Sequence, residues 1–193
     1  FGLDKPILAV CGDSTFYHAV IPALINAQHN RADITFIVLD NAGTAMTGFQ
    51  PHPGLTMSAL GETVPAVDIA AVCRGIGAKV AIADPFDIDT TTKILTGYLA
   101  QKGEVKVLIL RQACALSPEK KGKKTFDVRV NEELCLGDAC GCNRLCTRVF
   151  RCPALTWDKD KKKAVVDEVI CAGCGVCVSI CPQKAIEKAQ AVI

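Results

Sequence analysis

No stretch of the sequence is apolar over the eighteen or so residues that a membrane-spanning helix needs. The first residues, FGLDKPILAV, also lack the basic start, the apolar stretch and the cleavage site of a signal peptide. These two absences predict a soluble, cytoplasmic protein that does not contact a membrane.

The sequence also has little net charge. Its 22 Lys and Arg residues nearly balance its 20 Asp and Glu residues, and the basic residues form no continuous stripe. A nucleic-acid partner is therefore not expected. Hydrophobic residues make up 50% of the 193-residue chain, which is enough to bury a sizeable core in one or two domains.

Cysteine, in contrast, is abundant. The chain has 12 cysteines, and most of them fall between residues 135 and 181. A reducing compartment disfavours disulfides, so this local enrichment indicates metal ligands or clusters rather than a disulfide framework.

Residues 1–114 alternate short β-branched runs with helical segments. Near-continuous apolar strands between helices are typical of a parallel sheet covered on both faces, so the fold class we predict is α/β. The predicted strands are 6–12, 34–41, 80–84 and 105–110, and the predicted helices are 16–28, 67–78 and 90–101.

The composition changes at the polar stretch SPEKKGKK, residues 117–124. Such a stretch is typical of a linker or a solvated loop. We therefore divide the chain into a first domain at 1–114, a linker at 115–130 and a second, cysteine-rich domain at 131–193.

Polar residues follow the first two predicted strands, which end in CGDS and LDNAGTAMTG. Ligands of open parallel sheets bind beyond the carboxyl ends of the strands. Gly12 permits close backbone approach there, and Asp13 offers a hard carboxylate suited to Mg²⁺. Asn41 and the carbonyl of Gly43 could supply further oxygens. Each residue alone fits a helix cap or an Asx turn, but their joint pattern favours a metal and phosphate site.

The combination GDSTFYH…VLDNAGTAMTGFQPHPG resembles the diphosphate-binding half of thiamine-diphosphate enzymes. Among them it is most similar to the 2-oxoacid:ferredoxin oxidoreductases that act on indolepyruvate. The resemblance covers residues 1 to about 114, and TAMTGFQPHPG is its most specific part. It implies that Asp13, Asn41 and the carbonyl of Gly43 hold Mg²⁺, and that Gly12 to Ser14 approach the diphosphate.

The same resemblance implies two further roles. It places His18 on the thiazolium side of the cofactor as a catalytic candidate, although a histidine on a first helical turn is as often a structural hydrogen-bonding group. It also places a loop along the cofactor, in which a structural role is as frequent for any one residue. The loop residues concerned are Thr44, Met46, Thr47 and Gln50.

The run CAGCGVCVSICP places Cys171, Cys174, Cys177 and Cys181 at the spacing of bacterial ferredoxins. In that motif three close thiolates bind one [4Fe-4S] cluster, while the fourth, before a proline, binds the other cluster of a two-cluster protein. Zinc also uses Cys-x2-Cys pairs, but the third thiolate and the Cys-Pro favour iron–sulfur.

The preceding run, ELCLGDACGCNRLCTRVFRCP, contains five cysteines. In a reciprocal two-cluster arrangement, Cys152 joins the cluster of Cys171, Cys174 and Cys177. Cys181 joins three cysteines of the first run, which offers four: Cys135, Cys140, Cys142 and Cys146. One of these four is therefore spare.

We favour Cys135, Cys142 and Cys146 as the three ligands, because the separation of Cys142 from Cys146 is nearer to the standard motif. This set leaves Cys140 spare. A set of Cys140, Cys142 and Cys146 that frees Cys135 stays open.

The resemblance implies oxidative decarboxylation of a 2-oxoacid with coenzyme A, which gives an acyl-CoA and CO₂. The implied substrate is an aryl pyruvate such as indolepyruvate. Electrons would pass through two [4Fe-4S] clusters to ferredoxin. Two alternatives stay open: the same chemistry on pyruvate, a branched-chain 2-oxoacid or phenylglyoxylate, and a non-catalytic electron-transfer subunit.

In thiamine-diphosphate enzymes a glutamate from a separate domain activates the aminopyrimidine ring. No such domain precedes the first predicted strand of this sequence. We therefore expect the remaining thiamine-binding groups to come from further domains or from a second subunit in a hetero-oligomer, and the 193 residues alone to be inactive.

Overall fold

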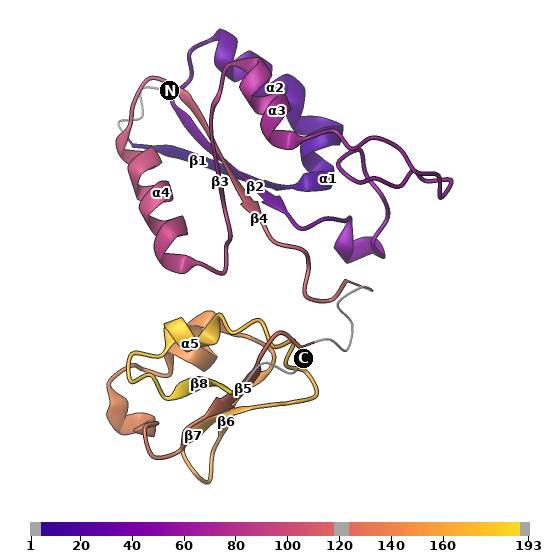
Figure 1. The fold of residues 1–193 in the computed structure, drawn as a ribbon. Helices are drawn as coiled ribbons and strands as arrows, with labels where there is room; N and C mark the ends of the chain where they lie inside the picture. The colour runs from indigo at the N-terminus through magenta and orange to yellow at the C-terminus, as the bar shows by residue number, and fades with distance from the viewer. Residues whose placement is uncertain (1–4, 118–123, 190–193) are drawn as a thin grey trace. The chain divides into compact units, whose positions relative to one another are not determined.

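The computed structural model describes residues 5–117 and 124–189, which fall into two compact units divided after Ser117 (Figure 1). Residues 118–123, inside the predicted linker, lie outside the described residues. Asp127–Val130, at the end of the predicted linker, forms a strand, β5. No helix of the described residues is long and apolar enough to cross a membrane.

The first unit contains a sheet of four parallel strands in the order β1-β2-β4-β3. This confirms the predicted parallel α/β fold. The strands are β1 (Ile7–Gly12), β2 (Ile34–Asp40), β3 (Lys79–Ala83) and β4 (Val105–Arg111).

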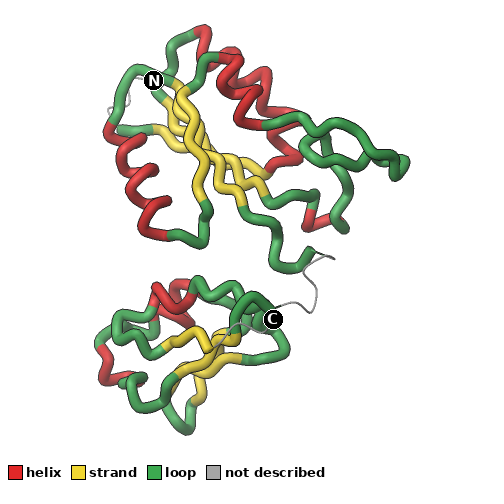
Figure 2. Tube along the Cα trace, in the orientation of Figure 1, coloured by secondary structure: helices red, strands yellow, loops and turns green. Residues whose placement is uncertain are grey.

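Helices cover both faces of this sheet, as Figures 1 and 2 show. One face carries α2 and α3, and the other carries α4. The helices are α1 (Asp13–Thr15), α2 (Ile21–His29), α3 (Ile69–Ile76) and α4 (Ile88–Ala100), with a π-helical turn (Phe16–Val20) that joins α1 to α2.

The side chains of β2 alternate between the two faces because successive residues of a strand point to opposite sides. Phe36 and Val38 lie in the larger core with Leu24 of α2 and Cys73 of α3. Ile37 lies in the smaller core under α4. Apolar residues on both sides explain why the strand sequence ITFIVLD reads as a continuous hydrophobic run.

Part of the face under α4 is left open among the described residues. Leu8 and Val10 of β1 lie on the same face as Ile37, because Val10 pairs with Ile37 in the parallel register and Leu8 lies two residues before Val10. They are 42% and 53% exposed, and Leu39 on the same face is 43% exposed. An apolar sheet surface of this kind is typical of a place where another element packs.

The second unit has two small antiparallel sheets. One pairs β5 with β8 (Ile186–Ala189), and the other is the hairpin of β6 (Leu155–Asp158) and β7 (Lys163–Val166). A short helix, α5 (Cys177–Ile180), packs against β8. The remaining chain is mostly loop, and it carries most of the cysteines (Figure 2).

Candidate functional site

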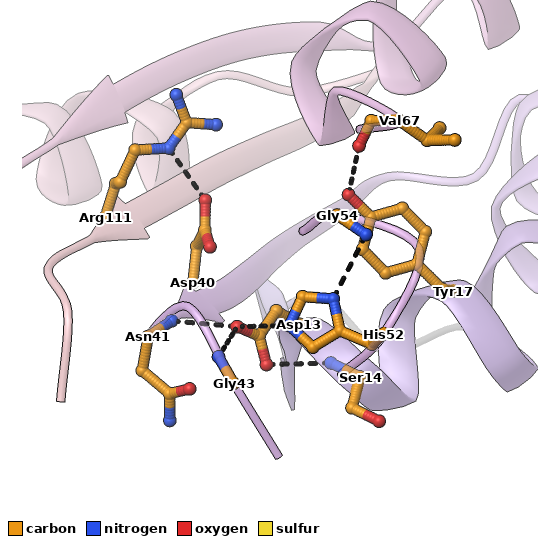
Figure 3. Close-up of polar contacts among 10 residues, drawn as sticks. All are labelled: Asp13, Ser14, Tyr17, Asp40, Asn41, Gly43, His52, Gly54, Val67 and Arg111. Atoms are coloured by element: carbon orange, nitrogen blue, oxygen red, sulfur yellow. Dashed lines mark hydrogen bonds and ion pairs between the residues drawn. The ribbon is translucent and has the colours of Figure 1, made fainter. Parts of the chain in front are cut away.

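Asp13 lies where β1 ends and the first helix begins, and it is buried, with 2% of its surface exposed. Its Oδ1 accepts a hydrogen bond from the backbone N–H of Ser14 at 2.8 Å. Its Oδ2 accepts from the backbone N–H of Asn41 at 3.0 Å and of Gly43 at 3.3 Å (Figure 3). The ends of two neighbouring strands thus meet at one carboxylate, as the sequence predicts for the carboxyl edge of a parallel sheet.

Three groups that could offer oxygen atoms to a metal meet beside Asp13. The end of the Asn41 amide lies 2.6 Å from the carbonyl oxygen of Gly43 and 3.3 Å from Oδ2 of Asp13. At these distances the amide nitrogen donates hydrogen bonds to both oxygens, and the amide would turn its oxygen inward to bind a cation. Carboxylate, amide and carbonyl oxygens are ligands that Mg²⁺ accepts, so this donor set fits that ion.

Gly12 leaves open space at the start of the helix. Its φ of −80° and ψ of 166° are extended angles that any residue adopts, and a Cβ built on it would meet no atom within 4 Å. Neither the backbone nor packing among the described residues therefore requires glycine here. The space suits a ligand at the N-terminus of the helical run 13–29, where free N–H groups favour an anion such as a diphosphate.

His52 is part of this site, although the sequence did not predict it. The side chain is 1% exposed, and its Nε2 lies 3.1 Å from Oδ2 of Asp13. Its Nδ1 accepts a hydrogen bond from the backbone N–H of Gly54 at 3.1 Å, and its ring stacks on Tyr17 with the centroids 5.5 Å apart (Figure 3). The available signal was its position in PHPG, within the most specific part of the sequence.

The predicted loop residues form a turn of their own. Thr44 pairs with Gln50 through the backbone, and the Thr47 hydroxyl lies 2.6 Å from the side-chain oxygen of Gln50. Met46 is fully exposed. Their contact with a cofactor stays a prediction.

His18 lies on the π-helical turn and is exposed. It lines a hollow of about 330 Å³ together with His52, Pro51 and Met57. A role on the thiazolium side of a cofactor stays a prediction for this residue.

Two further groups near Asp13 keep their protons. Burial and the charge of Asp13 raise the pKa of the Cys11 thiol to about 11. Burial, and then the carboxylates of Asp40, Asp68 and Asp13, raise the pKa of Tyr17 to about 12. The Tyr17 hydroxyl donates a hydrogen bond to the carbonyl of Val67. Cys11 is therefore a poor nucleophile here, and Tyr17 acts as a packing and hydrogen-bonding group.

In the second unit, one hollow is lined by all five cysteines that are candidate ligands of the cluster of Cys181. Its remaining walls are largely apolar and include Trp157, Val130 and Ile186. The cysteines are Cys135, Cys140, Cys142, Cys146 and Cys181.

The other four cysteines lie together elsewhere in this unit. Burial raises the pKa of the Cys177 thiol to about 11, and the nearby charges of Cys174, Cys152 and Cys171 add to that rise. Cys152 and Cys171 also pack against the core that contains Cys177. The cysteines therefore separate into two groups, and each run of the sequence contributes to both.

Cys140 and Cys142 differ in their surroundings. Burial raises the pKa of the Cys142 thiol, but the hydrogen bond from Cys140 and the backbone N–H groups of Leu145 and Arg144 outweigh it, and the pKa falls below its ordinary value. Burial and the hydrogen bond with Cys142 raise the pKa of Cys140. The two thiols are hydrogen-bonded to each other, and both line the hollow that also contains Cys181.

Within residues 5–117 and 124–189, no group of three or more His, Cys, Asp and Glu side chains is placed to hold a single metal ion. The set of Asp13, Asn41 and Gly43 is a different kind of site, because two of its members are an amide and a backbone carbonyl. The spacing of the cysteines in the sequence and their separation into two groups are the observations that fit iron–sulfur clusters.

Two families match this chain. The family described as thiamine pyrophosphate enzyme, C-terminal TPP binding domain, matches residues 2–109. The family described as 4Fe-4S binding domain matches residues 164–187. The first match covers the strands, helices and loop that build the Asp13 site, and the second includes the regular cysteine run.

Relatives resemble almost the whole chain. The indolepyruvate oxidoreductase subunit IorA of Pyrococcus horikoshii is 43% identical over 96% of this chain and 28% of its own length. The protein of the same name from Thermococcus kodakarensis is 42% identical over 96% of this chain and 29% of its own length. A solved structure of a putative thiamin diphosphate-dependent enzyme from Mycobacterium smegmatis is 24% identical, with a TM-score of 0.43, over 58% of this chain and 19% of that one.

The chain thus spans less than a third of the length of the relatives that it matches. The first family match falls within the unit that contains the Asp13 site, and the second falls within the unit that contains the cysteine groups. The chain belongs to the thiamine pyrophosphate enzymes, as a C-terminal TPP-binding domain that is followed by a 4Fe-4S binding domain.

Proposed function

We propose that this chain is the diphosphate-binding and electron-transfer part of a 2-oxoacid:ferredoxin oxidoreductase. The first unit binds Mg²⁺ and the diphosphate of thiamine diphosphate, and the second unit carries two [4Fe-4S] clusters. Thiamine diphosphate, when bound, supplies the chemistry that releases CO₂ from a 2-oxoacid, and the clusters provide a path for the electrons.

The observation that carries this proposal is the meeting of three potential metal ligands at the ends of two adjacent parallel strands. The Asp13 carboxylate accepts hydrogen bonds from the backbone N–H groups of Asn41 and Gly43, and the Asn41 amide lies 2.6 Å from the Gly43 carbonyl oxygen. The open space at Gly12 lies next to this set, at the helix N-terminus. A metal site beside an anion site is what a metal-bound diphosphate requires.

The chain's own residues would bind and orient rather than react. Asp13, Asn41 and Gly43 would hold the metal, while the segment from Gly12 to Ser14 would approach the diphosphate. These roles bind the cofactor without supplying a proton to it. The group that activates the aminopyrimidine ring would come from the part of the protein outside these residues, as would most contacts with the substrate.

For the second unit, the two cysteine groups support a reciprocal assignment. Cys181 and three cysteines of the first run would bind one cluster, with Cys142 favoured over Cys140. These cysteines would hold the clusters, which would supply the chain with a path for electrons toward ferredoxin. The ligands of the other cluster would be Cys152, Cys171, Cys174 and Cys177.

The substrate proposed is an aryl pyruvate, because the relatives named above act on indolepyruvate according to their names. Coenzyme A would accept the acyl group, which yields an acyl-CoA and CO₂ from the 2-oxoacid. The full enzyme would be a larger assembly, since the relatives are more than three times as long as this chain.

The test uses the intact protein with its other domains or subunits. Thiamine, magnesium, iron and sulfide are measured in the wild type and in Asp13→Asn, followed by a screen of 2-oxoacids with a low-potential dye. We expect Asp13→Asn to lose thiamine diphosphate and activity while it keeps its iron. The control Asp89→Asn replaces an exposed carboxylate in the first turn of α4 and should keep all of them.

A wild-type protein that contains no thiamine diphosphate and does not bind it in the presence of Mg²⁺ would refute the enzyme reading. The non-catalytic electron-transfer subunit would then be the remaining explanation. A protein that binds the cofactor but prefers pyruvate, a branched-chain 2-oxoacid or phenylglyoxylate over indolepyruvate would refute only the aryl pyruvate.

A further inference from the structure

We propose that His52 is a positioning residue that orients the Asp13 carboxylate for the metal and diphosphate. This inference rests on the proposed function, since it presupposes that Mg²⁺ and the diphosphate bind at Asp13. Nothing in the sequence motif of strands and glycines assigns such a role, and the residue is identified by its position in the folded chain.

The proton of the His52 ring lies on the side that faces Asp13. Nδ1 accepts a hydrogen bond from the backbone N–H of Gly54, so it cannot itself carry a proton. Nε2 therefore carries the ring proton, and it lies 3.1 Å from Oδ2 of Asp13. A donor that is fixed in this way points at an acceptor-only group.

The N–H of His52 has no hydrogen bond of its own among the described residues. Nε2 of His52 is buried and has no hydrogen bond of good geometry among the described residues, despite its short distance to Asp13. A buried N–H without a good acceptor is costly, and hydrogen bonds at binding sites often tighten only when the ligand is present. A small reorientation of the carboxylate toward a metal would complete the bond.

The ring itself has little freedom to move. Tyr17 stacks on it, with an angle of 27° between the two planes, and the Tyr17 hydroxyl is tied to the carbonyl of Val67. Gly54 lies so close that a Cβ on it would be 3.0 Å from Cε1 of His52. The imidazole is thus held by neighbours from the π-helical turn and from its own loop.

The consequence for Asp13 is a carboxylate held from several sides. Three backbone N–H groups already bond to its two oxygens, and the Nε2 of His52 lies 3.1 Å from Oδ2, ready to add a side-chain donor when the carboxylate turns. Residues that orient a metal ligand in this way commonly change metal affinity by about 10–100-fold when they are replaced. His52 also belongs to the loop that follows Gly43, so the same contact ties that loop to the metal site.

The test compares two amides at position 52 in the full-length complex. The side chain of His52→Gln places its N–H near the position of Nε2, whereas His52→Asn reaches only the position of Nδ1. The probe is Mn²⁺ at a fixed, saturating concentration of thiamine diphosphate, and the dissociation constant of Mn²⁺ is measured by electron paramagnetic resonance. His29→Asn, at the exposed end of α2, is the matched control.

We expect His52→Asn to weaken Mn²⁺ binding by about 10–100-fold, while His52→Gln restores most of the affinity and His29→Asn matches the wild type. Iron content and the thermal transition, measured on all variants, show that the chain is folded. A folded His52→Asn protein with wild-type affinity overturns the proposal, and so does a folded His52→Gln protein no better than His52→Asn. A wild type that binds neither Mn²⁺ nor thiamine diphosphate refutes the proposed function instead.

Discussion

Gly54 lies against Tyr17 so closely that a Cβ on the glycine would be 2.6 Å from the tyrosine hydroxyl oxygen and 2.8 Å from a ring carbon. These two residues come from the PHPG loop and from the π-helical turn Phe16–Val20, and their contact brings the loop against that turn. Only a glycine permits this approach, because any larger side chain would push the ring away.

Gly54→Ala should therefore destabilise the first unit and disturb the site together. Overpacking of this kind costs about 1–3 kcal/mol, and the displaced Tyr17 would no longer support the ring of His52. The measurements are the thermal unfolding midpoint and the affinity for thiamine diphosphate, both of which should fall. Gly97→Ala, in α4 with no atom within 4 Å of its Cβ position, is the control and should raise stability by about 0.5–1 kcal/mol. An unchanged midpoint in Gly54→Ala would show that the ring of Tyr17 moves freely.

Gly12→Ala should have the opposite profile. Its backbone angles are ordinary and its Cβ position is empty, so the folded chain should keep its stability. The added methyl group would enter the space proposed for the diphosphate, and we expect thiamine diphosphate to bind at least about tenfold more weakly, a loss of about 1.4 kcal/mol. Isothermal titration with Mg²⁺ present measures this affinity. Wild-type affinity in Gly12→Ala would mean that the diphosphate lies elsewhere.

Cys140→Ser and Cys142→Ser should separate the spare cysteine from the ligand. The separation of Cys142 from Cys146 is nearer to the standard ferredoxin motif than that of Cys140, which favours Cys142 as the ligand. We expect Cys140→Ser to keep both clusters, about eight irons per chain, and Cys142→Ser to lose about four. Iron and sulfide assays on protein prepared without oxygen give the counts. The reverse result would make Cys140 the ligand, and two variants that both keep eight irons would reopen the choice of Cys135.

The open apolar surface of β1 predicts that the 193 residues alone will self-associate. Leu8, Val10 and Leu39 are exposed on one face of the sheet, and such surfaces associate in water when nothing covers them. The double variant Leu8→Thr with Val10→Thr introduces threonine, which is β-branched and suits a strand but is more polar. It should shift the chain toward monomer in sedimentation velocity. Ile82→Thr, exposed on the opposite edge strand, should have little effect. A wild-type chain that is already monomeric at the same concentration would contradict this prediction.

The strands and helices of the first unit were predictable because their signals are local. Runs such as ITFIVLD are apolar on every residue, which indicates burial on both faces, and the structure buries Phe36, Ile37 and Val38 on alternate sides. The order of the strands was not predicted, since the insertion of β4 between β2 and β3 depends on packing between distant segments.

The site was predictable only where strand ends carry a pattern. Asp13, Asn41 and Gly43 follow two strands, and a parallel sheet brings such ends together. His52 follows no strand, and its contact with Asp13 arises because a long loop folds back, which no periodic signal reveals. In the second unit, β5 has only four residues, Asp127–Val130, and pairs with β8 at the far end of the chain. Its sequence DVRV is too short to distinguish from the linker before it.

The core of the second unit is small: its buried cluster consists of Val128, Leu155, Cys177 and Ile186. Several of the groups packed against it are the sulfur-bearing side chains of Cys146, Cys152, Cys171 and Cys181. With so few apolar side chains inside, the iron–sulfur clusters would have to form much of the interior, because small domains commonly depend on a bound metal for their stability. Loss of a cluster to oxygen would then unfold this half of the chain. Repair would require the unit to refold around new iron and sulfide, because no folded apo site would remain to accept them.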